Sequence, residues 1–113
     1  GAYYVTFFSA ADPVVAEFLQ RYVKEYNLSE LPSSNNVIAF YDITYWAKDV
    51  IERAGGTDDD EALRDAVNET NGLELYTGTM TVDPSNHNPL NREAVLMNVE
   101  EGKQVFVGRY KPE

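Results

Sequence analysis

One long helical segment near the middle of the chain constrains the fold more than any other feature. Residues 35–54 have helical spacing and end at Gly55-Gly56, and Ser33 or Ser34 is placed to cap the first turn. The first half of this segment is apolar on most sides, and such a helix must be buried against more than one neighbour. The rest of the chain supplies little to cover it. We therefore expect the sequence to be part of a larger protein.

Composition narrows the classes of partner. The 113 residues are enough for one domain at most, and 19 acidic against 9 basic side chains give a formal charge of −10. Such a surface repels nucleic acid phosphates and anionic membranes, so we expect neither as a partner. The absence of cysteine excludes disulfides and thiolate chemistry. No apolar run approaches the roughly 18–20 residues of a transmembrane helix.

The first part of the chain reads as a strand and a helix. Residues 3–8 are β-branched and aromatic, which predicts a strand covered on both faces. No export signal precedes them, which fits a segment of a longer chain. Asp12 followed by Pro13 predicts the start of an amphipathic helix over residues 13–26, and Asn27 is a suitable left-handed stop.

The remaining pattern predicts one helix and three strands. A helix is expected to start behind Asp58, with Glu61 as its capping-box partner, and to stop at residues 71–72. Residues 73–82 alternate with a period of two, as in a half-exposed strand. Two further strands are expected around a four-residue connection; they span 93–99 and 104–110. The order β-α-α-α-β-β-β is an α/β layout without its front end.

The polar loop at residues 83–89 contains the only histidine, His87, which could be a metal ligand or general base oriented by Asp83. We interpret the loop as a turn-rich surface segment, because Asp, Asn, Ser and Pro all form turns and no second histidine or cysteine could complete a transition-metal site. The spacing also lacks the glycine and bidentate glutamate of a calcium loop. Residues 58–61 are better explained by helix capping than by a cation site. We expect no metal and no cofactor.

Catalysis has little support in the sequence. No segment resembles a nucleophile elbow or a glycine-rich phosphate loop, and the serines occupy positions typical of helix caps and turns. The aromatic residues of the central helix fit a core better than a cofactor site. Asn35 and Asn36 differ, because free N–H groups in the first turn of a buried helix can bind a carboxylate or another polar group. Capping alone also explains both asparagines.

Four ordered stretches together carry a family resemblance over nearly all of the chain. They are Tyr3 to Phe8; Asp12-Pro13 with Phe18 and Tyr22; Ala39-Phe40-Tyr41-Asp42 leading to Ile51-Glu52-Arg53-Ala54-Gly55; and Ala62 to Ala66 with Tyr76 to Asp83 and the closing hairpin. The set resembles the C-terminal part of a branched-chain amino acid type ABC transporter substrate-binding protein. This is the type I periplasmic-binding protein fold.

The resemblance implies a fold and a division of the chain. Members of the family have two α/β lobes joined by crossing strands, so the chain would be a partial lobe of a three-layer parent. Residues 1–9 would form a crossing strand, residues 12–72 the helices that pack on the first lobe, and residues 73–113 the later strands and hairpin. The whole of 1–113 would then be a single fragment, the C-terminal third of the parent.

The resemblance also implies a function. Such proteins are not enzymes; they close on an amino acid or related small solute outside the cytoplasm, in the periplasm or as cell-surface lipoproteins, and present it to an ABC-transporter permease. The resemblance also makes Asn36, and Asn35 beside it, candidate ligand-binding residues. Tyr41 is a third candidate, although it could instead be a core residue. The family's main ligand clamp and its export signal are not in this sequence. We therefore expect no useful solute affinity from this chain alone.

Exposed apolar surface should then promote homodimerisation, strand exchange or aggregation. Two other functions stay open. The same fold serves as the ligand-sensing domain of receptors, in which case a signalling partner replaces the permease. A free-standing interaction module is the second alternative, and a monomer that unfolds cooperatively would favour it.

Overall fold

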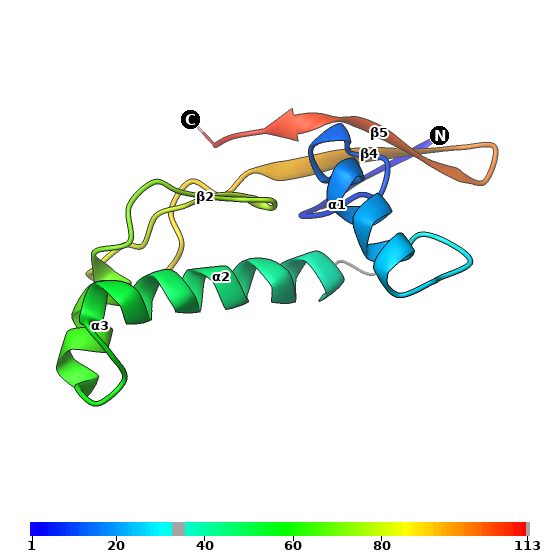
Figure 1. Cartoon of the computed structure of the whole chain (residues 1–113). Helices are drawn as coiled ribbons and strands as arrows, with labels where there is room; N and C mark the ends of the chain where they lie inside the picture. Colours follow the sequence, from blue (N-terminus) through cyan, green and yellow to red (C-terminus); the bar gives the residue numbers. More distant parts are fainter. Residues whose placement is uncertain (33–35, 113) are drawn as a thin grey trace.

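A computed structural model describes residues 1–32 and 36–112. The elements are, in chain order, β1 (Ala2–Thr6), α1 (Pro13–Glu25), α2 (Asn36–Ala54), α3 (Asp60–Asn68), β2 (Leu73–Leu75), β3 (Gly78–Met80), β4 (Ala94–Glu100) and β5 (Lys103–Tyr110). The predicted sequence of one strand, three helices and a run of strands is therefore confirmed. In Figure 1 the sheet that contains β4 and β5 runs along one side of the molecule and α2 along the other.

Helix α1 forms as its sequence predicts. The Asp12 carboxylate accepts a hydrogen bond from the Val14 amide at 3.0 Å, and Pro13 occupies the first helical position. The helix buries one apolar face, and Asn27 follows it with a φ of 50°. The buried side chains of this face are Val15, Phe18 and Leu19. Local capping signals and amphipathic spacing agree here, and packing of the apolar face in the core stabilises the helix.

Helix α2 is apolar but poorly covered. Its interior side contains only three buried residues, Ile38, Asp42 and Val50. Phe40 remains 69% exposed and Ile43 53% exposed. Two ion pairs between residues four positions apart form near its end, Lys48–Glu52 and Asp49–Arg53. The predicted caps Ser33 and Ser34 lie outside the described residues. The described part of the chain therefore leaves this apolar helix largely open to solvent.

Helix α3 starts and ends differently from the prediction. Its N-cap is Asp59, whose carboxylate accepts hydrogen bonds from the amides of Glu61 and Ala62 at 3.0 Å. The predicted cap Asp58 is wrong by one position, so Glu61 is not the capping-box partner. The helix also ends at Asn68, before residues 71–72. Thr70 explains the early end, because its backbone oxygen accepts a hydrogen bond from the Val82 amide.

The main sheet has three antiparallel strands in the order β1-β4-β5. Strand β1 is an edge strand, and its Tyr3 and Val5 side chains are 67% and 66% exposed. The prediction that residues 3–8 are covered on both faces is therefore wrong for the described chain. The apolar sequence is typical of a covered strand, but no described segment covers the face of β1 that presents Tyr3 and Val5.

Two tight turns also differ from the expected pattern. The predicted single strand over 73–82 is a hairpin, in which β2 and β3 pair antiparallel around Tyr76-Thr77. The alternating pattern continues through the turn, so periodicity alone could not reveal it. In the last hairpin Glu100 pairs with Lys103, so the connection has two residues instead of four. Both of its residues, Glu101 and Gly102, have positive φ, as type I′ hairpin turns require.

The molecule is flat and its core is small. The buried apolar cluster consists of Phe8, Val15, Phe18, Leu19 and Ile38. The chain extends 52 × 38 × 16 Å, and its radius of gyration is 16.4 Å. A compact domain of this length has a radius of gyration of about 13 Å. No described helix is long and apolar enough to cross a membrane.

Candidate functional site

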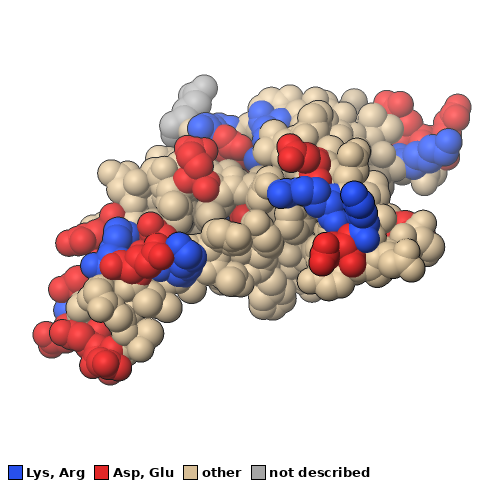
Figure 2. Space-filling model, viewed as in Figure 1, with Lys and Arg blue, Asp and Glu red and all other residues tan. Residues whose placement is uncertain are grey.

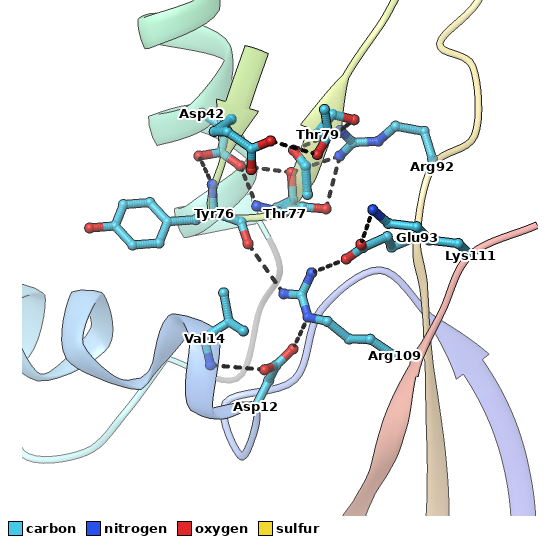
Figure 3. A network of polar contacts seen from close by, with 12 residues as sticks. Asp12, Val14, Asp42, Tyr76, Thr77, Thr79, Arg92, Glu93, Arg109 and Lys111 are labelled. Atoms are coloured by element: carbon cyan, nitrogen blue, oxygen red, sulfur yellow. Dashed lines mark hydrogen bonds and ion pairs between the residues drawn. The ribbon is translucent and has the colours of Figure 1, made fainter. Parts of the chain in front are cut away.

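The turn between β2 and β3 is the centre of a polar network (Figure 3). Asp42 of α2 is only 4% exposed, and its carboxylate accepts hydrogen bonds from the Tyr76 amide at 3.1 Å and the Thr77 amide at 2.7 Å. The Thr77 hydroxyl donates a third, also at 2.7 Å. Buried carboxylates need such donors to remain charged. Asp42 therefore attaches α2 to the hairpin.

Two arginines reach the same turn, Arg92 from the connection before β4 and Arg109 from β5. Arg92 donates to the Thr77 hydroxyl at 2.7 Å and to its backbone oxygen at 3.2 Å. Arg109 of β5 donates to Asp12 at 2.6 Å, to Glu93 at 3.0 Å and to the Tyr76 backbone oxygen at 3.2 Å. The planar guanidinium suits such multiple bonds. The turn is therefore held between α2 on one side and the sheet on the other.

These ion pairs change the pKa values of their members. The hydrogen bond from Arg109, with a smaller contribution from Lys111, lowers the pKa of Glu93, although burial opposes the shift. Burial alone would lower the pKa of Arg109, but the carboxylates of Glu93 and Asp12 outweigh it and the pKa is raised. Both shifts favour the charged pair.

Next to the network lies a cluster of aromatic rings from α1, α2 and the hairpin turn. Phe18 contacts Tyr41 with ring centroids 4.7 Å apart and Tyr76 at 5.2 Å. Tyr41 also contacts Tyr45 at 4.7 Å. The guanidinium of Arg21 donates to the Tyr76 hydroxyl at 2.7 Å. Aromatic contacts of this kind are worth about 0.5–1.5 kcal/mol each beyond area burial.

Two surface pockets flank this cluster, and Tyr41 lines both. The first has a volume of about 370 Å³; its walls are Val14, Tyr41, Asp42, Tyr45, Glu74, Leu75 and Tyr76. The second has a volume of about 540 Å³; its walls are Phe18, Arg21, Tyr22, Glu25, Tyr26, Val37, Phe40, Tyr41 and Thr44. Figure 2 shows that charged side chains gather over α1 and over the end of α2, with an uncharged area between them.

The structure places two of the predicted ligand-binding residues, Asn36 and Tyr41, on α2. Asn36 is the first residue of α2 and is exposed, and it is not among the residues that line either pocket. Asn35 lies outside the described residues. Tyr41 is half-buried, five positions after Asn36, and belongs to the aromatic cluster. The role of all three in binding stays a prediction.

The histidine loop has the turn geometry expected of a surface segment. The His87 imidazole Nδ1 lies 2.7 Å from the amide oxygen of Asn68, and the Asp83 carboxylate accepts hydrogen bonds from the amide and hydroxyl of Ser85. The Ser85 hydroxyl lowers the pKa of Asp83. Within residues 1–32 and 36–112, no group of three or more histidine or acidic side chains could hold a metal ion.

Sequence reasoning missed Asp42, Arg92 and Arg109. Asp42 had a recognisable signal, because it is the only charged residue among positions 36–47 of an otherwise apolar helix. A lone carboxylate on such a face needs buried donors. The arginines had no comparable signal, since Arg92 lies in the connection before β4 and Arg109 in an ordinary strand. Their partners come from segments far away in the sequence.

Comparison with known proteins gives a consistent result at the level of structure. No protein-family model matches the chain, and no curated protein matches its sequence. Among solved structures, a leucine binding protein LivK from Thermotoga maritima matches 99% of this chain with a TM-score of 0.74 and 24% identity. The match spans 31% of that protein.

Two further structures agree. A solute binding protein of an ABC transporter from Rhodopseudomonas palustris, in complex with p-hydroxybenzoic acid, matches 98% of this chain with a TM-score of 0.75 and 20% identity, over 31% of its own length. The branched-chain amino acid transporter substrate binding protein LivJ from Streptococcus pneumoniae, in complex with isoleucine, matches 97% with a TM-score of 0.63 and 24% identity, over 30% of its length. The chain thus spans about a third of each protein that it matches. It has part of the type I periplasmic-binding protein fold of ABC-transporter substrate-binding proteins.

Proposed function

We propose that this chain is the C-terminal third of an extracytoplasmic solute-binding protein, which captures an amino acid or related small solute and delivers it to an ABC-transporter permease. The observation that carries the proposal is the match of 97–99% of the chain to about a third of three solute-binding proteins. A fold alone does not define a function. Here three separate solute binders share the same arrangement.

The structure supports the proposal through its uncovered apolar surface. Helix α2 leaves Phe40 and Ile43 more than half exposed, and β1 does the same with Tyr3 and Val5. An apolar surface of this extent on a flat chain is unusual for a monomer. It is expected of a segment that packs against further parts of a two-lobe protein. The free-standing interaction module has less support for the same reason.

Asn36, Asn35 and Tyr41 are the proposed contributions of this segment to the ligand site. Asn36 begins α2, where the positive end of the helix dipole favours a carboxylate or a polar oxygen. Tyr41 belongs to the aromatic cluster, and its side chain lines both pockets. The remaining contacts to the solute would come from residues outside this chain.

The test compares this chain with the protein extended by the sequence that precedes residue 1 in its source. Both are titrated with a panel of amino acids, amides, urea and aromatic acids, and followed by two-dimensional amide NMR and thermal unfolding. We expect dispersed but unchanged spectra for the short chain. We expect one solute class to stabilise the extended protein, by about 2.7 kcal/mol at a hundredfold excess over Kd.

Asn36→Ala in the extended protein should weaken that binding, whereas Asn88→Ala in the exposed polar loop should not. An extended protein that binds no member of the panel would overturn the proposal. Shifts at residues of the short chain near Asn36 would show that the site is complete without further sequence. The alternative of a ligand-sensing receptor predicts the same binding but a signalling module, in place of a permease, as the partner.

A further inference from the structure

The pocket between α2 and the β2–β3 hairpin has an unusual lining. Three of its seven wall residues are tyrosines and two are carboxylates; the full set is Val14, Tyr41, Asp42, Tyr45, Glu74, Leu75 and Tyr76. None of these residues is positively charged. With a volume of about 370 Å³, the pocket is near the lower end of the range for small-molecule sites.

The charge at this pocket is negative and not neutralised by ion pairs. Among the described residues, neither Asp42 nor Glu74 takes part in a salt bridge. Asp42 is hydrogen-bonded to neutral donors of the hairpin turn, and Glu74 accepts a hydrogen bond from the Thr79 hydroxyl at 3.1 Å. These bonds position the carboxylates without cancelling their charge. Figure 3 shows Asp42 held against the hairpin turn in this way.

The aromatic side chains supply a second attraction for positive charge. The rings of Tyr41 and Tyr45 are 4.7 Å apart, and Tyr76 meets Tyr41 edge-on at 5.7 Å. The face of an aromatic ring attracts a cation, and several rings around one position form the cages that bind quaternary ammonium groups. Tyr45 is 50% exposed, so a ligand can reach its ring from solvent.

The neighbouring pocket provides a natural contrast. It is also aromatic, but the guanidinium of Arg21 forms part of its wall. Arg21 is bonded to the hydroxyl of Tyr76. The wall of this neighbouring pocket also contains the Glu25 carboxylate, so it carries one positive and one negative side chain. The first pocket has two carboxylates and no cation among its wall residues, although Arg21 reaches the hydroxyl of its Tyr76.

We propose that the pocket lined by Tyr41, Tyr45, Tyr76 and Glu74 binds a small organic cation, a quaternary ammonium group without a carboxylate of its own. The cation stacks against the exposed tyrosine ring and lies near the Asp42 and Glu74 carboxylates. This inference goes beyond the proposed function, because every residue it uses belongs to this chain. It holds whether or not the parent protein transports solutes.

The test uses tetramethylammonium chloride as the probe and two-dimensional NMR of the whole chain as the readout. Matched titrations use 2,2-dimethylpropan-1-ol, which has a similar shape without charge, and sodium chloride at equal ionic strength. We expect saturable shifts at Tyr41, Tyr45 and residues 74–76 with the ammonium ion only. The uncharged compound should bind at least roughly threefold to tenfold more weakly.

Two substitutions at exposed positions separate the contribution of the aromatic ring to cation binding from the contribution of the carboxylate charge. Tyr45→Leu removes a ring but keeps an apolar wall, and Glu74→Gln removes a charge without changing shape. Each should weaken binding of tetramethylammonium by roughly threefold or more. Phe40→Leu, in the neighbouring pocket, should leave binding unchanged. Dispersed variant spectra confirm that the fold is intact.

Three results would overturn the proposal. They are shifts that grow linearly without saturating, equal binding of the uncharged compound, and a Phe40→Leu effect as large as that of Tyr45→Leu. The first would indicate bulk ionic effects, and the second an apolar hollow with no preference for charge. The third would place the probe at the neighbouring pocket.

Discussion

The amide of Thr77 donates a hydrogen bond of 2.7 Å to the carboxylate of Asp42, a residue 35 positions earlier in the chain. This contact joins the long helix to the hairpin turn, and Arg92 contacts the same threonine from the opposite side. The fold has few apolar contacts between its sheet and its helices. Hydrogen bonds and ion pairs at this one turn therefore stabilise the association of helices and sheet, which in most domains depends on a hydrophobic core.

Replacing Asp42 with alanine should lower the free energy of unfolding by roughly 2–4 kcal/mol, because the Tyr76 and Thr77 amides and the Thr77 hydroxyl would lose their acceptor. Urea denaturation measures the change. Asp65→Asn is the matched control, since Asp65 is 60% exposed and pairs only with Arg64. A loss for Asp42→Ala no greater than that of the control would contradict this account of the turn.

Arg109→Met should destabilise the chain by about 2–4 kcal/mol, because it removes the guanidinium, leaves the buried Asp12 without its cation and leaves Glu93 paired only with the exposed Lys111. Arg109→Lys should recover only part of this loss, since an ammonium group cannot reproduce the planar fork. Arg64→Met, at an exposed ion pair, is the control and should change stability little. Equal stabilities of the lysine variant and the wild type would show that the fork geometry is unimportant.

Stability should fall with acid because of Glu93. Its folded-state pKa is depressed below the ordinary value of 4.5 by Arg109 and Lys111. The contribution is therefore present above pH 4.5 and is lost as the pH falls through the folded-state pKa. Carbon-detected NMR of the side-chain carboxyl should show this pKa, and Arg109→Met should raise it. An unchanged Glu93 titration in that variant would exclude the ion pair as the cause.

Thr70→Val should cost roughly 1–3 kcal/mol. The buried Thr70 hydroxyl accepts hydrogen bonds from the Trp46 indole and from Arg53, both at 3.0 Å, and valine leaves these donors unpaired. Because Trp46 is the only tryptophan, its fluorescence reports the change directly. Thr44→Val, at an exposed hydroxyl that bonds only to the Phe40 backbone, is the control.

The uncovered apolar surface should make the chain self-associate as its concentration rises. Its charge of −10 opposes association, so added salt should strengthen it by screening. Sedimentation velocity at several salt concentrations measures this, and Phe40→Lys on the exposed face of α2 should reduce it. Lys48→Glu, on the charged part of the same helix, serves as the control. A monomer at all concentrations and salt levels would support the free-standing module.

Local chemistry explains why the helices could be predicted well. The start of α1 is encoded by Asp12 and Pro13, and Gly55 with φ of 80° follows α2 where the sequence expects its end. The cap of α3 was harder, because Asp58, Asp59 and Asp60 can all accept hydrogen bonds from a first turn. Only the path of the preceding chain selects among them. For the candidate site, the sequence predicted only that ligand-binding residues lie in the central helical segment.

The sequence by itself determined the order of elements, the helix boundaries near strong caps, and the excess of apolar surface over what this chain can bury. It did so because capping and periodicity are properties of neighbouring residues. Only the tertiary structure decided that residues 73–82 fold back as a hairpin and that Asp42 and Arg109 meet at its turn. The hairpin pairs are local, but Asp42 and Arg109 contact its turn residues from more than thirty positions away, and such contacts leave no periodic signal in the sequence.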